Sequence, residues 1–195
     1  MKTMLKLTAS LGAICLIGSA ALTWVQSITR EPIRQADERA LTANLKMVLP
    51  VETQTTRQVR EDGDARVFEA TDSSGALIGF AVQATGKGGF GGDVKALVGF
   101  FPDGAIRTVM ISEHKETPGI GTKATDRKVQ RSLWDVLKGK APETAYPPNA
   151  FLDRFNGTRE GTVQAISGAT YSSGAVNDAV RQARTALAAY MKEVK

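Results

Sequence analysis

Cysteine and histidine are almost missing from this chain of 195 residues, which has one of each, Cys15 and His114. Structural zinc, iron–sulfur and c-type haem sites each need several Cys or Cys/His ligands, so the sequence predicts no metal centre. A disulfide framework is excluded for the same reason. His114 alone could serve as a general base, but a lone histidine in a loop is more often a solvated polar residue. We therefore expect no catalytic residues in this chain.

Runs of basic residues are also missing, although the formal net charge is +5 and the isoelectric point is near 9.4. The positive charges are dispersed among acidic residues, as in residues 107–128, and they are not interleaved with aromatic side chains. This pattern is typical of a solvated surface, and it does not favour nucleic acid as a partner. A single domain, large enough to bury an ordinary core, is expected from the chain length.

Charged residues are missing from residues 7–29, a stretch long enough to cross a bilayer, which takes roughly 20 residues. A cleaved signal peptide is the alternative, because Lys2 and Lys6 form a basic start and residues 18–20 resemble a cleavage site. Apolar residues continue past that point and Trp24 lies at an interfacial position, which favours a retained transmembrane helix. The Lys and Arg counts on the two sides are nearly equal, so local charge does not fix its orientation.

A second helix is predicted over residues 30–50, where apolar residues recur with charged residues between them. Pro32 near its start and Pro50 at its end bracket this helix, which we expect to extend the anchor into the domain. The predicted parts of the chain are a basic tail (1–6), the transmembrane helix (7–29), the linking helix (30–50) and one domain (51–195).

The pattern of the domain is that of an α+β fold, with an antiparallel sheet and flanking helices. Residues 66–85 predict two strands around a Ser-Ser-Gly turn, and residues 94–112 predict two more around a Pro-Asp-Gly turn. The other predicted elements are a helix at about 126–137, a short strand at 163–166 and a terminal helix that begins near Ser172 or Ser173.

Two glycine-rich loops lie among the strands, residues 86–93 (GKGGFGGD) and 116–123 (ETPGIGTK). Neither follows the Gly-x-Gly-x-x-Gly pattern of a Rossmann loop or the Gly-Lys-Ser/Thr ending of a P-loop. A tight connection between strands explains the first loop. The second loop holds Glu116, Thr117 and Pro118 before its glycines, a polar and rigid arrangement that favours cradling a ligand.

Hydroxyl and small side chains are concentrated at the start of the terminal helix, in residues 165–176 (AISGATYSSGAV). The free N–H groups and the dipole of a helix start favour an anion such as phosphate. N-capping by Ser172 or Ser173 is the simpler interpretation. It leaves the small residues before Thr170 unexplained, because they would let a bulky group approach that hydroxyl. A Ser or Thr hydrolase is a third interpretation, for which His114 is the only imidazole available.

Three segments in this order resemble the FMN-binding domain of the G subunit of Rnf-type, ion-translocating ferredoxin:NAD oxidoreductase complexes. In chain order they are the loop and strand GGFGGDVKALVGF at 88–100, ETPGIG at 116–121, and SGAT ending at Thr170. The resemblance covers nearly the whole chain, including the N-terminal helix. The C subunit of the sodium-pumping NADH:quinone oxidoreductase is a close relative of this family and stays as an alternative, although it tends to be longer.

The resemblance implies a covalent FMN, joined by a phosphoester between the flavin phosphate and Thr170, with a separate flavin transferase making the bond from FAD. The cofactor would then carry the electrons, while the protein supplies position and electrostatics. The residues implied to surround the FMN are Ser167, Gly168, Ala169, Glu116, Thr117, Gly119, Ile120 and Gly121.

The same resemblance implies an electron-relaying subunit that catalyses no complete reaction alone. Its domain would lie on the periplasmic side of the bacterial inner membrane, and its partners would be the membrane subunits, the other flavin subunit and the iron–sulfur subunits of the complex. A flavin-free assembly or sensor module and a secreted ligand-binding protein stay as alternatives. Two positions depart from the family pattern: Gln164 replaces an acid that would help the modification, and Ile120 stands where Leu is commoner.

Overall fold

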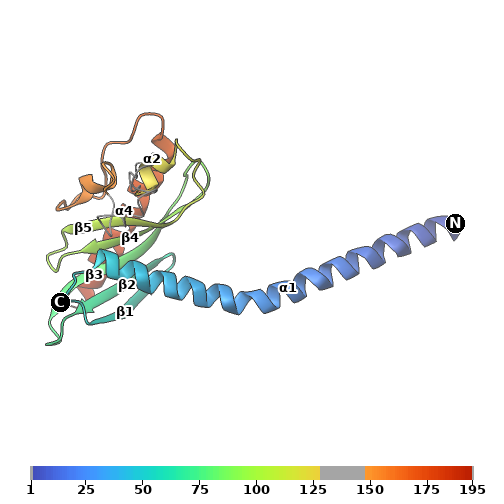
Figure 1. Ribbon diagram of the computed structural model, residues 1–195, viewed down its shortest axis with the longest axis horizontal. Helices are drawn as coiled ribbons and strands as arrows, with labels where there is room; N and C mark the ends of the chain where they lie inside the picture. The colour runs from blue at the N-terminus through green and yellow to red at the C-terminus, as the bar shows by residue number, and fades with distance from the viewer. Residues whose placement is uncertain (1, 128–147, 195) are drawn as a thin grey trace, which may run out of the picture. The chain divides into compact units, whose positions relative to one another are not determined.

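The computed structural model describes residues 2–127 and 148–194. The chain forms two compact units, Met1–Thr42 and Ala43–Lys195. A single helix, α1 (Lys2–Val48), accounts for the described part of the first unit and continues into the second (Figure 1). The predicted transmembrane and linking helices are therefore parts of one continuous helix.

The linking segment, residues 30–50, continues the N-terminal helix, and Pro32 lies inside α1. A proline inside a helix removes one backbone hydrogen bond, and the turns on either side must compensate for it. Ion pairs lie across this turn, where the Arg34 guanidinium contacts Glu31 at 2.8 Å and Glu38 at 3.2 Å. The predicted end of the helix was nearly correct, since α1 stops just before Pro50.

Among the described residues, α1 is the one helix long and apolar enough to cross a membrane. Its large apolar side chains are exposed, among them Leu11, Ile14, Leu22 and Trp24. A signal sequence would have a similar length and composition. The first unit thus presents apolar surface that has no protein partner within the unit.

The second unit contains a five-stranded antiparallel sheet in which the strands lie side by side in sequence order, as Figure 1 shows. The four strands predicted on either side of the Ser-Ser-Gly and Pro-Asp-Gly turns are confirmed, together with these two turns. A fifth strand at the edge was missed because its sequence, TTRQVRED, has one apolar residue, Val59, and is mostly exposed. The strands are β1 (Thr55–Asp62), β2 (Ala65–Thr71), β3 (Leu77–Gly86), β4 (Val94–Phe100) and β5 (Ile106–Glu113).

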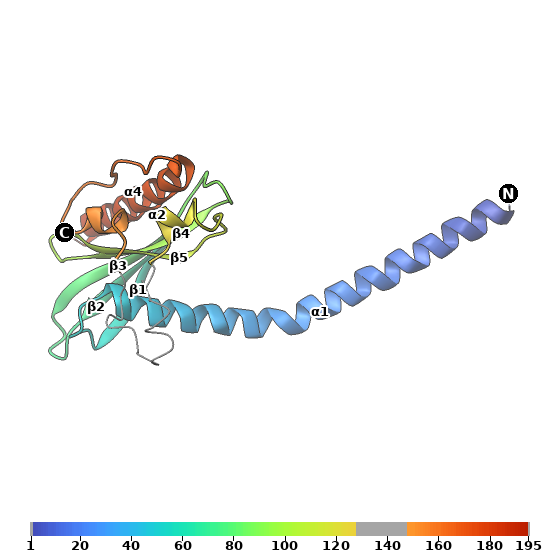
Figure 2. The ribbon, with the colours of Figure 1, turned by 45° about the horizontal axis from the view of Figure 1, so that its top comes forward.

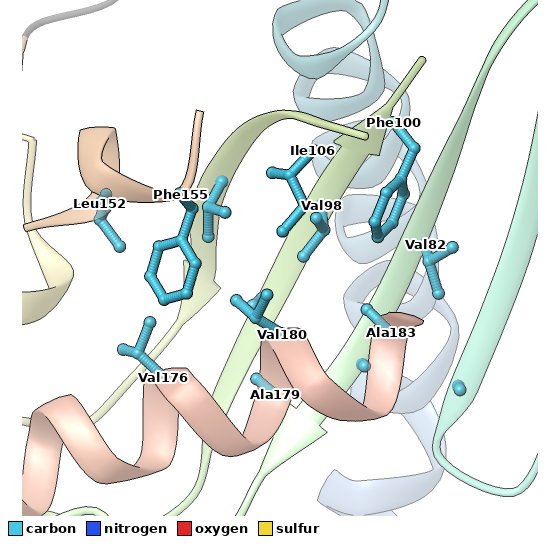
Figure 3. Packing of buried hydrophobic residues seen from close by; sticks show 14 of the residues in the cluster. Val82, Val98, Phe100, Ile106, Leu152, Phe155, Val176, Ala179, Val180 and Ala183 are labelled. Atoms are coloured by element: carbon cyan, nitrogen blue, oxygen red, sulfur yellow. The ribbon is translucent and has the colours of Figure 1, made fainter. Parts of the chain in front are cut away.

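One face of the sheet packs against the terminal helix α4 (Thr170–Glu193), which Figure 2 shows lying over the strands. The apolar face predicted for this helix is confirmed, since all of its predicted members are buried against the sheet (Figure 3). A Cβ on Gly86 would lie 1.8 Å from the carbonyl oxygen of Ala175, so only glycine lets α4 come this close to β3. The residues of this face are Val176, Ala179, Val180, Ala183 and Leu187.

The opposite face of the sheet is covered by the end of α1 that belongs to the second unit. Leu45 and Val48 are buried there, and a Cβ on Gly99 of β4 would lie 2.3 Å from the carbonyl oxygen of Val48. Leu97, whose side chain points to this face of β4, is also buried. The central strands are therefore buried on both faces, which explains their nearly continuous apolar sequence.

Residues 163–166, predicted to form a short strand, are irregular. The Asn177 side chain of α4 replaces a neighbouring strand: its amide oxygen accepts from the Val163 N–H and its amide nitrogen donates to the Val163 carbonyl, both at 2.9 Å. Because the side chain satisfies both backbone groups, no ladder is needed. Two short helices, α2 (Thr122–Thr125) and η1 (Leu152–Phe155), complete the described elements; most of the helix predicted at about 126–137 lies outside the described residues.

Candidate functional site

A pocket of about 380 Å³ lies at the beginning of α4. It brings together the three segments that the sequence singled out, since its walls come from the loop 86–93, the loop 116–123 and the SGAT segment. Its lining is apolar and hydroxyl-bearing, with no charged side chain among the described residues. The lining residues are Phe90, Ile120, Gly168, Ala169, Thr170, Tyr171 and Ser172.

The start of α4 lies at Thr170, slightly earlier than the sequence predicted, and its N-cap residue Ala169 makes no side-chain capping hydrogen bond. Ser172 and Ser173 are both buried and bonded elsewhere. The Ser173 hydroxyl accepts from the Ile166 N–H at 3.1 Å, and the Ser172 hydroxyl donates to Glu116 Oε2 at 2.7 Å. The simpler interpretation, in which Ser172 or Ser173 caps the helix, therefore does not hold, and the first turn of α4 has no side-chain cap.

The Thr170 hydroxyl belongs to an exposed residue on the wall of the pocket. The chain reaches it through Gly168, whose φ of +78° is readily adopted only by glycine. A turn follows, in which the Ala169 N–H donates to the Ile166 carbonyl at 3.0 Å. Ser167 is exposed but does not line the pocket. The small residues before Thr170 therefore build a tight turn that leaves its side chain open to an approaching group.

The loop 116–123 contributes one side chain to the pocket wall, that of Ile120, which is half-exposed. Thr117 and Gly119 form the turn behind it: the Thr117 carbonyl accepts from the Gly121 N–H at 3.1 Å, and the Gly119 N–H donates to Thr122 Oγ1 at 2.8 Å. Glu116 and Gly121 are buried beneath the wall. The structure thus brings all the predicted residues of this loop to the site, but most of them shape it and do not line it.

His114, the only imidazole in the chain, has both ring nitrogens engaged. Its Nδ1 accepts from the Glu116 N–H at 3.2 Å, and its Nε2 lies 2.8 Å from Asp126 Oδ1. Both ring nitrogens are therefore already occupied by contacts within this loop region. This arrangement supports the interpretation of His114 as a structural residue and disfavours the hydrolase interpretation.

Two aromatic residues that line the pocket, Phe90 and Tyr171, were not predicted from the sequence as site residues. Phe90 is 71% exposed and Tyr171 is 72% exposed, although both line the pocket. Phe90 is held there because the loop 86–93 packs tightly on its neighbour: a Cβ on Gly91 would lie 1.8 Å from the Lys115 carbonyl oxygen. An isolated aromatic residue between pairs of glycines was the available signal.

Comparison with known proteins agrees with this site. The FMN-binding domain family matches residues 89–185, a range that contains every residue lining the pocket. The G subunit of an ion-translocating oxidoreductase complex from Methanosarcina acetivorans is 28% identical over 93% of this chain and 93% of its own length. The chain belongs to the family of G subunits of Rnf-type oxidoreductase complexes. The family predicted from the motifs is confirmed.

Other members of this family show similar agreement. The G subunit of an ion-translocating oxidoreductase complex from Cereibacter sphaeroides is 29% identical over 90% of this chain and 80% of its own length. The G subunit of the Na⁺-translocating ferredoxin:NAD⁺ oxidoreductase complex from Acetobacterium woodii is 27% identical, over 92% of this chain and 89% of its own length. The similarity therefore extends over nearly the full chain, including α1.

Proposed function

We propose that this chain carries FMN in the pocket at the start of α4, attached by a phosphoester to Thr170, and relays electrons within an ion-translocating oxidoreductase complex. The observation that supports the attachment is the Thr170 hydroxyl, which lies on the pocket wall in the first turn of a helix without a side-chain cap. The membership in a family of FMN-binding subunits supports the cofactor.

The phosphate of FMN fits the SGAT side of the pocket. A phosphodiester to Thr170 would keep one negative charge, which the first-turn N–H groups and the dipole of α4 stabilise. Gly168 and Ala169 present no bulky side chain on the wall beside that hydroxyl. This chain would therefore both tether the phosphate and neutralise part of its charge.

The ring of FMN fits the apolar side of the pocket, where Phe90, Ile120 and Tyr171 come from three separate segments. The volume of about 380 Å³ lies within the usual range for small-ligand sites, roughly 300–1,000 Å³. Bound FMN supplies the oxidation–reduction chemistry, for which the side chains of this domain are not suited. The role of these residues is to orient the ring and to exclude water from one part of its surface.

A separate flavin transferase would attach the FMN, as the family resemblance implies, because both ring nitrogens of His114 are engaged by Glu116 and Asp126. Transfer from FAD forms the bond between the Thr170 oxygen and the phosphorus, breaks the pyrophosphate bond and releases AMP. Gln164, where the family usually has an acid, is exposed, and its backbone carbonyl accepts from Arg154 at 3.2 Å. We expect this exposed side chain to affect the efficiency of attachment more than its site.

The exposed apolar surface of α1 supports a membrane anchor for the proposed subunit. With the family resemblance, it favours a domain on the periplasmic side of the inner membrane, next to the membrane, flavin and iron–sulfur subunits of the complex. The names of the relatives, which are subunits of such complexes, support these partners as a class.

The mass of the peptide that contains Thr170, taken from protein purified from its native membrane, tests the attachment. We expect an increment equal to FMN less water, with the modified oxygen assigned to Thr170 by fragmentation. The increment should disappear in Thr170→Ala and persist in Ser167→Ala, which removes an exposed hydroxyl from the same turn but outside the pocket. An unmodified peptide from membranes with an active complex would contradict the proposal and favour a flavin-free module.

A further inference from the structure

A carboxylate lies directly beneath the wall of the proposed flavin pocket. Glu116 is only 6% exposed and is not among the lining residues, but its Oε2 accepts the hydrogen bond from Ser172, which does line the pocket. A single side chain, that of Ser172, therefore connects this carboxylate to the pocket. No ion pair to Glu116 is found within residues 2–127 and 148–194.

The Glu116 carboxylate is fixed between two glycine loops. A Cβ on Gly121 would lie 2.3 Å from Oε2, and a Cβ on Gly89 would lie 2.5 Å from Oε1. Within the described part of the chain, Oε1 is buried and has no hydrogen-bond partner. A Cβ on Gly89 would also lie 2.3 Å from the Gly92 carbonyl oxygen, so the loop itself leaves no room for a side chain there. The carboxylate is thus closely packed beneath the pocket, and within residues 2–127 and 148–194 the Ser172 hydroxyl is the side-chain donor to it.

We propose that Glu116 sets the reduction potential of the flavin by placing a buried negative charge beneath the pocket. This inference rests on the proposed function, because it needs FMN in that pocket. Reduction adds electrons to the flavin, so a fixed negative charge nearby makes the reduced form less favourable and lowers the potential. The effect is large for a buried charge, which solvent and salt screen poorly.

Glu113, three residues earlier in the chain, provides a matched control. Its carboxylate is exposed and lies 2.5 Å from the ammonium of Lys95, whose hydrogen bond holds the pKa of Glu113 below its usual value. Glu113 is therefore a carboxylate of the same type, but it is paired and in contact with solvent. Its charge should have little effect on the pocket.

A redox titration of the flavin in the full-length, FMN-loaded protein tests the inference. The protein is reduced with dithionite in the presence of mediator dyes at one fixed pH near neutrality, and the flavin absorbance is followed. Glu116→Gln keeps the size of the side chain and should raise the potential. At the wild-type midpoint, the ratio of reduced to oxidised flavin should rise on the order of tenfold. Glu113→Gln should leave the potential unchanged.

The variant Ser172→Ala should shift the potential in the opposite direction, to lower values, because it removes the hydrogen bond that offsets the carboxylate. Shifts of opposite sign support a charge effect, whereas shifts of the same sign in both variants indicate local distortion and overturn the inference. An unchanged potential in Glu116→Gln also overturns it. If Glu116→Gln does not fold, Ser172→Ala decides alone: a lower potential supports the inference, and an unchanged or higher one overturns it. Failure of the proposed function is distinguishable, since the wild-type Thr170 peptide would then carry no flavin.

Discussion

The helices α1 and α4 are both rich in apolar residues, but they use them in different ways. In α4 the apolar residues recur on one face and are buried against the sheet, as Leu187 is, with 3% of its surface exposed. Over residues 7–29 of α1 the apolar residues lie all around the helix and are exposed, as Leu16 is, at 74%. A periodic apolar pattern thus indicates a helix with a protein partner. An uninterrupted one of sufficient length indicates a helix whose partner is lipid.

The largest effect is expected from Leu187→Asp, which buries a charge in the face between α4 and the sheet. Burial of an unpaired carboxylate and loss of the leucine contacts should cost more than about 4 kcal/mol, enough to unfold a domain of ordinary stability. Circular dichroism should show no cooperative thermal transition. A folded variant with an unchanged melting temperature would contradict the packing of α4 described here.

The same substitution in α1, Leu16→Asp, should leave the domain folded with an unchanged melting temperature. A charge at the centre of a membrane helix costs about 2.5–3.5 kcal/mol, so the variant should be recovered less completely in the membrane fraction. Fractionation followed by detection of the protein measures this loss. Equal recovery of the wild type and the variant would contradict the anchor, and cleavage at residues 18–20 in the mature chain would favour a signal peptide.

A pair of glycine substitutions tests how closely α4 lies on β3. Gly86→Ala places a methyl group 1.8 Å from the Ala175 carbonyl oxygen, which forces α4 away from the sheet and should cost about 1–3 kcal/mol or more. Gly174→Ala, at an exposed position of α4 with nothing within 4 Å of the new Cβ, should stabilise the domain by about 0.5–1 kcal/mol. Urea unfolding measures both changes, and equal effects of the two substitutions would contradict the predicted contact.

A smaller loss of stability than that of Gly86→Ala is expected from Asn177→Ala, which removes both hydrogen bonds to the Val163 backbone. The loss should cost about 1–2 kcal/mol and increase hydrogen exchange in residues 163–169, which lead to the pocket. Thr185→Ala, which removes an exposed hydroxyl on the same helix, is the control and should change neither quantity. Unchanged hydrogen exchange in Asn177→Ala would show that the two hydrogen bonds of Asn177 do not order residues 163–169.

The strands and turns of the domain could be predicted from the sequence because their signals are local. Short apolar segments and the Ser-Ser-Gly and Pro-Asp-Gly turns carry the information for β2 to β5 within a few residues of each other. The edge strand β1 has no such apolar segment, and its backbone is held by antiparallel pairing with β2. Residues 163–166 show the reverse case, since an apolar segment with strand-like composition is held by Asn177, a side chain from another element.

The candidate site was predicted in part, again according to the range of the signal. The motifs around Thr170 and Ile120 are contiguous and could be found in the sequence, but Phe90 and Tyr171 became pocket residues only when three segments met. Ser172 illustrates the limit most clearly. As a hydroxyl at a helix start it predicted an N-cap, and in the fold it donates to Glu116, which lies 56 residues away in the chain.

The sequence alone determined the α+β class, the apolar character of the N-terminal helix and the position of Thr170 close to a helix start. Each of these depends on residue type and on spacing within one segment. The tertiary structure alone decided which face of each strand is covered by which helix, how closely α4 approaches β3, and that the Glu116 carboxylate lies beneath the pocket. These features depend on contacts between segments far apart in the chain, where close packing selects one arrangement and the local sequence carries no record of the partner.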